Sequence, residues 1–399
     1  MRQIPDVERR ARLALRHAVA PGRRAADPVA ATRAMTVLHA TEPATVFLSL
    51  FARVEGLTHE EVDRVLYDDR SLVKQLAMRR TLFVFPRELL PAAWGSASAR
   101  VAAQLRARLA KDAEAAGIAE DGAAWLEAAC AAVLDRLADG SALGAQALRE
   151  QVPELQGRIE VAAGKSYGGN FPIAPRVLTQ LGVEGATVRG RNGGHWRLSR
   201  PQWALMRHWL GEEAAPLKPD EGYAELVSRW LAAFGPGTAA DLQWWLGATA
   251  GAVKRALADV GAVQVELDGG AVGWVLPDDV DPVPGGEPWA ALLPVLDPTV
   301  MGWKERGFFL GPHGADLFDR NGNAGTTAWW DGRVVGCWVQ DASGVVHLEL
   351  LEDVGADARE ALEAEAARLT AWLDGTRVST VYPSPAMKNA AARLGPGVA

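Results

Sequence analysis

The sequence predicts an α+β protein with three tandem winged-helix units followed by a small C-terminal β-barrel-like domain. Helical stretches are followed by a candidate β-hairpin at three places, Arg80–Pro86, Ala186–Leu198 and Ala262–Leu276. Residues 290–350 then alternate strand-like runs with Asn-Gly, Asp-Gly and Ser-Gly turns, which favours a small barrel or a curled sheet. Helices followed by a wing are typical of nucleic-acid binding, and also of protein-interaction modules.

Chain length and the positions of turn and linker residues divide the sequence into four predicted domains. At 399 residues the chain is too long for one ordinary core. We place a first winged helix with its linking helix at residues 1–112, a second at 113–218, a third at 219–283 and the barrel-like domain at 284–399.

The composition is that of an ordinary globular protein, with 49% hydrophobic and 23% charged residues. Arg and Asp interrupt the N-terminal segment, unlike a signal peptide, and no apolar run reaches the ~18–20 residues that span a bilayer. Cys130 and Cys337 lie far apart without metal-binding spacing, which fits a reducing cytoplasm. We therefore expect a cytoplasmic monomer that has no metal, no cofactor and no membrane partner.

The charge distribution favours a polyanion docking on the N-terminal half. Residues 1–111 hold 19 Lys and Arg against 11 Asp and Glu, whereas residues 219–399 hold 12 against 25. Residues 112–218 are nearly balanced, with 11 against 13. Phosphate contacts need Lys and Arg, so the basic N-terminal region is the expected contact surface. The alternative is an asymmetry of solvated faces without function.

The first unit begins with an amphipathic helix over Asp6–Ala20. Asp27 caps a second helix with Pro28 at its first position. A third helix begins near Thr41, and a fourth is predicted over Asp63–Gln75. The run Thr81–Phe85 then reads as a strand that ends at Pro86.

The second and third units repeat this order. In the second unit, helices over Ala123–Ala138 and Leu143–Glu150 precede a hairpin with an Asn192-Gly193 turn. In the third, we predict helices over Tyr223–Phe234, Ala239–Leu246 and Ala252–Val260, with a hairpin around Asp268-Gly269-Gly270. Acidic residues surround this last hairpin, so we expect it to be structural.

The C-terminal region follows a Pro-rich linker, Pro282–Pro288. After the predicted strands, Ala356–Leu373 reads as an amphipathic helix. The β-branched run Val378–Tyr382 is predicted to add a closing strand.

The second hairpin carries the strongest nucleic-acid signal. Its basic and aromatic side chains are suited to phosphate contact or to insertion in a groove. The alternative is a cationic wing without function. The candidate DNA-binding residues are Arg79, Arg80, Lys165, Arg176, Arg189, Arg191, His195, Trp196 and Arg197.

His39-Ala40-Thr41-Glu42-Pro43 is the candidate catalytic segment. A residue before proline is pushed away from helical geometry, so this segment is expected to be extended. Residues two apart in an extended chain point the same way, so His39 and Thr41 would project together. An imidazole and a hydroxyl can hold and partly deprotonate a water molecule. The alternative is that Thr41 only caps the following helix.

Four segments of the chain carry a resemblance to one family, and that resemblance extends over nearly the whole chain. They are VLHATEPATVFLSLFARVEG, LAMRRTLFVFP, DPTVMGWKERGFFLGPH and WWDGRVVGCW. The family is the winged-helix group that includes bacterial DNA glycosylases for bulky alkylpurine and interstrand-crosslink lesions (the AlkZ/YcaQ type). The resemblance implies three winged helices and a terminal barrel arranged around a DNA-sized channel, with double-stranded DNA as partner.

The resemblance also implies a catalytic role for His39 and Thr41. The family's motif is Gln–aliphatic–Gln or Gln–aliphatic–Asp, and its place is taken here by His39-Ala40-Thr41. No acidic general base lies in this motif unless Glu42 turns inward. We therefore expect a DNA glycosylase-like protein acting on alkylated purines. A DNA-binding protein without catalysis and a protein-interaction scaffold are the competing hypotheses.

Overall fold

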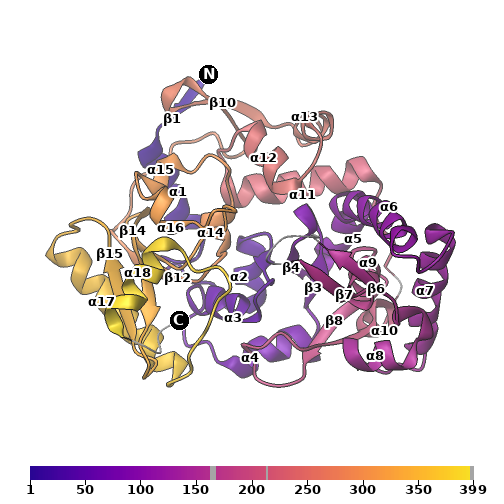
Figure 1. Ribbon diagram of the computed structural model, residues 1–399. Coiled ribbons are helices and arrows are strands. Elements are labelled where there is room, and N and C mark those ends of the chain that lie inside the picture. Colours follow the sequence, from indigo (N-terminus) through magenta and orange to yellow (C-terminus); the bar gives the residue numbers. More distant parts are fainter. Residues whose placement is uncertain (162–167, 213, 396–399) are drawn as a thin grey trace. The chain divides into compact units, whose positions relative to one another are not determined.

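The computed structural model describes residues 1–161, 168–212 and 214–395, and it shows a mixed α+β protein with several small sheets (Figure 1). The chain forms two compact units. Unit 1 combines Met1–Val62 with Ala224–Ala399, and unit 2 is the continuous segment Asp63–Tyr223. The N-terminal helices therefore fold together with the C-terminal part of the chain. The four predicted domain boundaries stay predictions.

In unit 1, the N-terminal strand joins the third predicted hairpin. Strand β1 (Arg2–Ile4) pairs parallel with β10 (Val263–Leu267), which pairs antiparallel with β11 (Val272–Val275). The predicted third hairpin is thus confirmed, and it gains a strand from the far end of the chain. The buried apolar side chains of this sheet are Ile4, Val265, Leu267 and Val275.

The N-terminal helices of unit 1 follow the capping signals of the sequence. Helix α1 (Asp6–Arg16) is shorter than predicted, and Ala18 beyond it has a left-handed φ of 54°. Helix α2 (Pro28–Ala34) begins as predicted, because the Asp27 carboxylate accepts a hydrogen bond from the Ala30 N–H at 2.8 Å. The next elements are β2 (Leu38–His39), α3 (Pro43–Phe51) and α4 (His59–Asp63).

The helices before β10 agree well with the sequence prediction. They are α11 (Pro219–Phe234), α12 (Ala239–Leu246) and α13 (Ala250–Asp259). Helix α12 begins with a capping box, in which Thr238 and Asp241 each accept a hydrogen bond from the other's backbone N–H.

The C-terminal part of unit 1 contains a sheet in the order β12-β13-β14-β15. Among the described residues β12 and β15 are not paired with each other, so the sheet is open and the predicted closed barrel is not confirmed. Helix α17 packs on β12 and β15, and α18 packs on β14 (Figure 1). The bounds are β12 (Ala290–Leu293), α14 (Pro298–Met301), α15 (Gly307–Leu310), α16 (Gly314–Leu317), β13 (Thr327–Trp330), β14 (Arg333–Gln340), β15 (Val346–Leu350), α17 (Ala356–Leu373) and α18 (Pro385–Leu394).

The predicted closing strand Val378–Tyr382 is wrong, because this segment is irregular in the structure. Its backbone N–H groups bond to side chains instead of to a neighbouring strand. The Val378 N–H donates to Gln340 Oε1 at 2.9 Å, and the Val381 N–H donates to Glu42 Oε1 at 2.7 Å.

Unit 2 has a helical core beneath small sheets. Buried side chains that include Leu126, Val133, Leu178 and Trp203 form one hydrophobic cluster. The elements of the unit are β3 (Leu72–Leu76), β4 (Leu82–Pro86), α5 (Leu90–Ala93), α6 (Ala99–Ala115), α7 (Gly122–Arg136), β5 (Leu143–Gly144), α8 (Ala145–Gln151), β6 (Arg158–Val161), β7 (Gly169–Pro172), α9 (Ala174–Val183), β8 (Thr187–Asn192), β9 (Pro201–Leu205) and α10 (Met206–Leu210).

The predicted helix Asp63–Gln75 is wrong in its second half. Helical geometry ends with a π-helical turn at Arg64–Asp68, and Leu72–Leu76 forms β3, the antiparallel partner of β4. All five residues of β3 are buried. The first hairpin is therefore made of β3 and β4, and its turn carries Arg79 and Arg80.

Candidate active site and nucleic-acid interface

The candidate catalytic residues lie on the short segment between α2 and α3. His39 belongs to β2 and is 4% exposed, and Ala40 is 3% exposed, whereas Thr41 is exposed. The segment is extended as predicted, because Glu42 before Pro43 has φ −102° and ψ 126°. The structure therefore places a buried imidazole two residues before a solvent-accessible hydroxyl. That His39 and Thr41 act as a pair stays a prediction.

Helix α3 fixes the end of this segment. Pro43 occupies its first turn, which suits the ring's fixed φ, and every residue from Ala44 to Phe51 is buried. The N-cap residue is Glu42, whose side chain makes no capping hydrogen bond, so the predicted start near Thr41 is shifted by one residue. The Thr45 hydroxyl donates to the Val295 carbonyl at 3.1 Å, which attaches the first turn of α3 to the chain after β12.

A buried ion pair anchors the other end of α3. The Arg53 guanidinium donates to both carboxylate oxygens of Asp297, at 2.9 and 2.7 Å, and both side chains are 0% exposed. The Ser49 hydroxyl adds a third hydrogen bond to Asp297 at 2.7 Å. Burial opposes ionisation of Asp297, but Arg53 and these hydrogen bonds outweigh it and hold the pKa of that carboxyl below its ordinary value.

His17 extends this buried network through Thr299. The Thr299 hydroxyl accepts from Arg53 Nη2 at 2.8 Å and lies 3.0 Å from His17 Nδ1, while His17 Nε2 lies 3.1 Å from the Ala233 carbonyl. A carbonyl only accepts, so Nε2 carries the proton and Nδ1 accepts from Thr299. Burial and the nearby Arg53 charge lower the pKa of His17 to about 3, so the ring is neutral.

Glu42 is directed to the C-terminal segment of unit 1. Its Oε1 accepts from the Thr380 hydroxyl at 2.9 Å and from the Val381 N–H at 2.7 Å. Burial raises the pKa of this carboxyl, and the two hydrogen bonds only partly offset that effect. The carboxyl next to the candidate motif is thus engaged away from it in this structure.

In unit 2, the first hairpin presents its two arginines in a strained turn. Arg79 and Arg80 have left-handed φ values of 53° and 59°. Arg80 is exposed, and Arg79 is partly buried. A turn that holds two consecutive arginines in this conformation projects charge from the end of β3 and β4.

The second hairpin separates its basic residues into inner and outer groups. Arg189 lies 5.1 Å from the Trp203 ring centroid, and burial lowers its pKa. Beside it, buried Lys74 donates to the Tyr67 hydroxyl at 2.7 Å, and burial together with the Arg189 charge lowers the pKa of Lys74 to about 7. Arg191 lies 4.9 Å from the Tyr67 ring centroid at the exposed edge of this cluster, and it makes ion pairs with Asp63 and Asp68.

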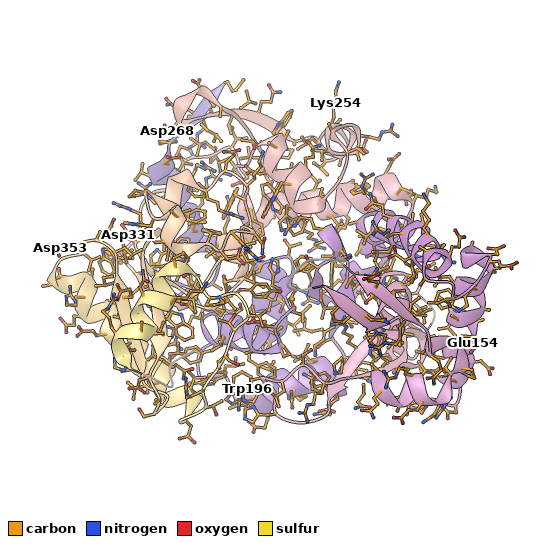
Figure 2. The ribbon with its side chains drawn as sticks, viewed as in Figure 1. Glu154, Trp196, Lys254, Asp268, Asp331 and Asp353 are labelled. Carbon is orange, nitrogen blue, oxygen red and sulfur yellow. The ribbon has the colours of Figure 1, made fainter. Side chains whose placement is uncertain are left out.

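The loop after β8 holds the remaining wing residues. The predicted hairpin Ala186–Leu198 is wrong in its second strand, because β9 begins at Pro201 and residues 193–200 form a loop. His195 and Arg197 are exposed on this loop. Trp196 between them is partly exposed (Figure 2). The His195 and Trp196 ring centroids are 5.4 Å apart.

The other two candidate DNA-binding residues are not part of this loop. Arg176, on α9, makes an ion pair with Asp112 at 2.6 Å, so its charge is already compensated. Lys165 lies outside the described residues.

Comparisons with known proteins agree on one family. The model of the DNA glycosylase AlkZ-like family matches residues 32–372, most of the chain and including the His39–Thr41 segment. The chain belongs to the AlkZ-like DNA glycosylase family. Among solved structures, the Streptomyces sahachiroi DNA glycosylase AlkZ is similar, with a TM-score of 0.71 and 19% identity over 93% of this chain and 98% of that chain. At this identity the likeness shows the fold. Comparison with curated proteins gives no match.

The resemblance predicted from the four sequence segments is therefore confirmed, and family membership supports a DNA glycosylase-like function on damaged DNA. None of the helices among the described residues has the length and apolar character that a membrane crossing requires.

Sequence reasoning missed the buried polar residues around the site. Asp297 before Pro298 carried a cap signal, which would have placed it at the start of a helix. Nothing in the sequence paired it with Arg53, 244 residues away. Lys74 was hidden by the prediction of a helix where the structure has β3.

Proposed function

We propose that this protein hydrolyses the N-glycosidic bond of alkylated purines, N7-alkylated or crosslinked, in duplex DNA. The observation that carries the proposal is an exposed Thr41 beside a buried His39, on an extended segment within the region matched by a DNA glycosylase family. The buried network beneath α3 gives this segment a rigid support, which catalytic groups need if they are to hold a water molecule in place.

The leaving group needs little activation by the protein, because an N7-alkylated purine is already cationic and leaves readily. Thr41 orients the attacking water, and neutral His39 accepts its proton. The N-terminus of α3, just after Thr41, favours the negative charge that develops on that water. Protonated His39 would oppose the positive charge on the sugar, so activity should fall at low pH.

DNA contact is assigned to the basic residues of the hairpins. We propose that three helix-and-hairpin units act as tandem winged helices, with the barrel-like domain replaced here by an open sheet. Exposed Arg80 and Arg197 are the best-placed phosphate contacts, because neither forms an ion pair with a carboxylate within the described part of the chain. Trp196 and His195 are suited to stacking or insertion, and Arg79, Lys165, Arg176, Arg189 and Arg191 complete the proposed contact set.

The test is base release from N7-methylated and from crosslinked duplex DNA. We expect His39→Ala, which removes the proton acceptor, to lower the release rate by about 10²–10⁴-fold. Thr41→Ala removes only the orienting hydroxyl and should lower the rate by a smaller factor. Lys254→Ala, on the exposed face of α13, is the control variant and should release base at the wild-type rate. Release that is unaffected by either motif substitution contradicts the site assignment.

A DNA-binding protein without catalysis is the second candidate function. It is favoured by the motif itself, which departs from the family's Gln residues at both polar positions. Salt-sensitive binding of damaged duplex DNA with no base release would establish this alternative.

A further inference from the structure

Unit 1 contains a cavity of about 260 Å³ that the proposed chemistry does not use. Its apolar wall includes Leu48 from α3, Trp338 from β14, and Met387 and Ala391 from α18. Three charged side chains also line it, Glu42, Arg377 and Lys388. An apolar cavity with a few polar groups is the usual form of a small-molecule site.

Two of these charged side chains, Glu42 and Arg377, have a buried polar atom with no hydrogen-bond partner among the described residues. In Glu42 this atom is Oε2, since Oε1 accepts from Thr380 and Val381. In Arg377 it is Nε. Buried polar atoms are nearly always hydrogen-bonded, because an unpaired one costs free energy. These two atoms offer one strong acceptor and one strong donor to a ligand, and Lys388 adds a second cationic donor to the lining.

This combination selects a particular kind of ligand. The lining side chains Trp338 and Met387 both favour contacts with a flat heterocycle, because an aromatic ring and a thioether pack well on aromatic faces. It must present N–H donors to the carboxylate and carbonyl or ring-nitrogen acceptors to the guanidinium. Guanine has this pattern, with N1–H and the 2-amino group at one edge and O6 and N7 at another, and arginine is the common partner of O6 and N7.

We propose that this cavity binds a guanine-type purine, with Glu42 accepting from its N–H edge and Arg377 donating to its O6/N7 edge. Glu42 follows Thr41 directly in the chain, so an occupied cavity would contact the residue next to the candidate catalytic motif. The inference concerns binding and goes beyond the proposed hydrolysis.

Calorimetric titration of the full chain with nucleosides tests the ligand class. Guanosine should bind saturably at one site. Adenosine presents an acceptor where guanosine has N1–H, so it should bind at least ~tenfold more weakly, since a site built for a donor rejects an analogue lacking it. Equal binding of the two nucleosides, or no saturable binding of guanosine, overturns the proposal.

Two substitutions test the location. Glu42→Gln keeps the side-chain shape and removes the charge, so guanosine affinity should fall about tenfold or more. Ala391→Phe fills the cavity without touching Glu42 and should abolish binding even if Glu42→Gln disturbs the C-terminal segment. Glu363→Gln, an exposed position on α17, is the matched control and should leave affinity unchanged. Unchanged affinity in both cavity variants contradicts the assignment.

A single-stranded trinucleotide with one guanine identifies the source of the base. Tighter binding of the trinucleotide than of guanosine indicates a base presented by a strand, and binding of guanosine alone indicates a free base or nucleoside. Base release from N7-methylated DNA is measured on the same samples. If the protein binds guanosine but releases no base from N7-methylated DNA, the proposed function is contradicted and the cavity assignment remains.

Discussion

Arginine has opposite roles in two regions of this protein. Beneath the candidate motif in unit 1, Arg53 is completely buried and bound to both oxygens of Asp297. On the second hairpin of unit 2, Arg197 is exposed on the loop between β8 and β9. The buried guanidinium fixes the backbone of α3, whereas the exposed one is available to a phosphate. The charge of Arg53 holds the fold through its ion pair with Asp297, whereas the charge of Arg197 is expected to attract DNA phosphate during association.

The comparison also explains why net charge is a poor guide to function here. The protein carries −7 overall, yet its arginines are divided among buried pairs, surface pairs and exposed positions. Arg191 and Arg176 are ion-paired with carboxylates of their own unit. DNA would have to compete with those carboxylates, so we expect the exposed positions to dominate binding.

The largest effect is expected from breaking the buried pair. Arg53→Met leaves the Asp297 carboxylate buried without its counter-charge, and the free energy of unfolding should fall by about 3–5 kcal/mol. Denaturant unfolding measures this loss. Arg197→Met is the matched control and should change stability by less than about 0.5 kcal/mol. Comparable losses in the two variants would remove the contrast between the regions.

Acid should weaken the same network through His17. Its folded-state pKa of about 3 lies below the ordinary value of 6.5, so the unfolded chain binds more protons between these values. Stability is therefore present above pH 6.5 and is lost as the pH falls, by about 3 kcal/mol between pH 7 and pH 4. Thermal unfolding across this range should show a weaker pH dependence for His17→Gln, whose amide can keep both hydrogen bonds. A slope equal to that of wild type would contradict a neutral His17.

The exposed hairpin loop should affect DNA affinity and not stability. Removing one phosphate contact with Arg197→Ala should reduce the slope of log K against log salt by about 0.9 and weaken binding at low salt. Fluorescence anisotropy with duplex DNA measures both quantities. Lys254→Ala removes an exposed cation from α13 (Figure 2), in a part of the sequence where acidic residues outnumber basic ones, and should have no effect. Equal losses of DNA affinity in the two variants would show that binding depends only on net charge and not on the position of Arg197.

The smallest effect is expected at Glu42, and its sign is opposite to that of His17. Burial raises the pKa of Glu42, so the folded state binds the proton more tightly than the unfolded chain. Its contribution to stability is greatest at low pH and declines as the pH rises above the ordinary pKa of a glutamate. Glu42→Gln should remove this decline, which unfolding at several pH values between acid and neutral would detect. A stronger decline in the variant would refute the assigned direction.

Local signals in the sequence predicted the elements whose stability is local. Asp27 with Pro28 located the start of α2, and the predicted helix Ala239–Leu246 has the same bounds as α12. The hairpin around Asp268-Gly269-Gly270 was also predicted, because two consecutive glycines at positive φ mark such a turn. These residues determine nearby backbone geometry, so no distant contact was needed to predict it.

The wrong secondary-structure predictions occur where polar groups have hydrogen-bond partners that are distant in the sequence. Lys74 and Gln75 ended the predicted helix Asp63–Gln75, but both are buried in β3. The Gln75 side chain donates to the Gly182 carbonyl at 2.9 Å and accepts from Trp94 Nε1 at 2.9 Å. Conversely, Val378–Tyr382 has a strand-like composition but finds side-chain acceptors in place of a neighbouring strand.

The sequence by itself determined the α+β class, the third hairpin, the extended His39–Thr41 segment and the family. Each of these depends on local propensity, turn chemistry or matching residues in order. Only the tertiary structure decided that Arg53 meets Asp297, that Glu42 binds the C-terminal segment, and that the N-terminal strand completes the third hairpin. Burial and pairing depend on residues hundreds of positions apart, and those contacts set the pKa values and the support of the candidate site.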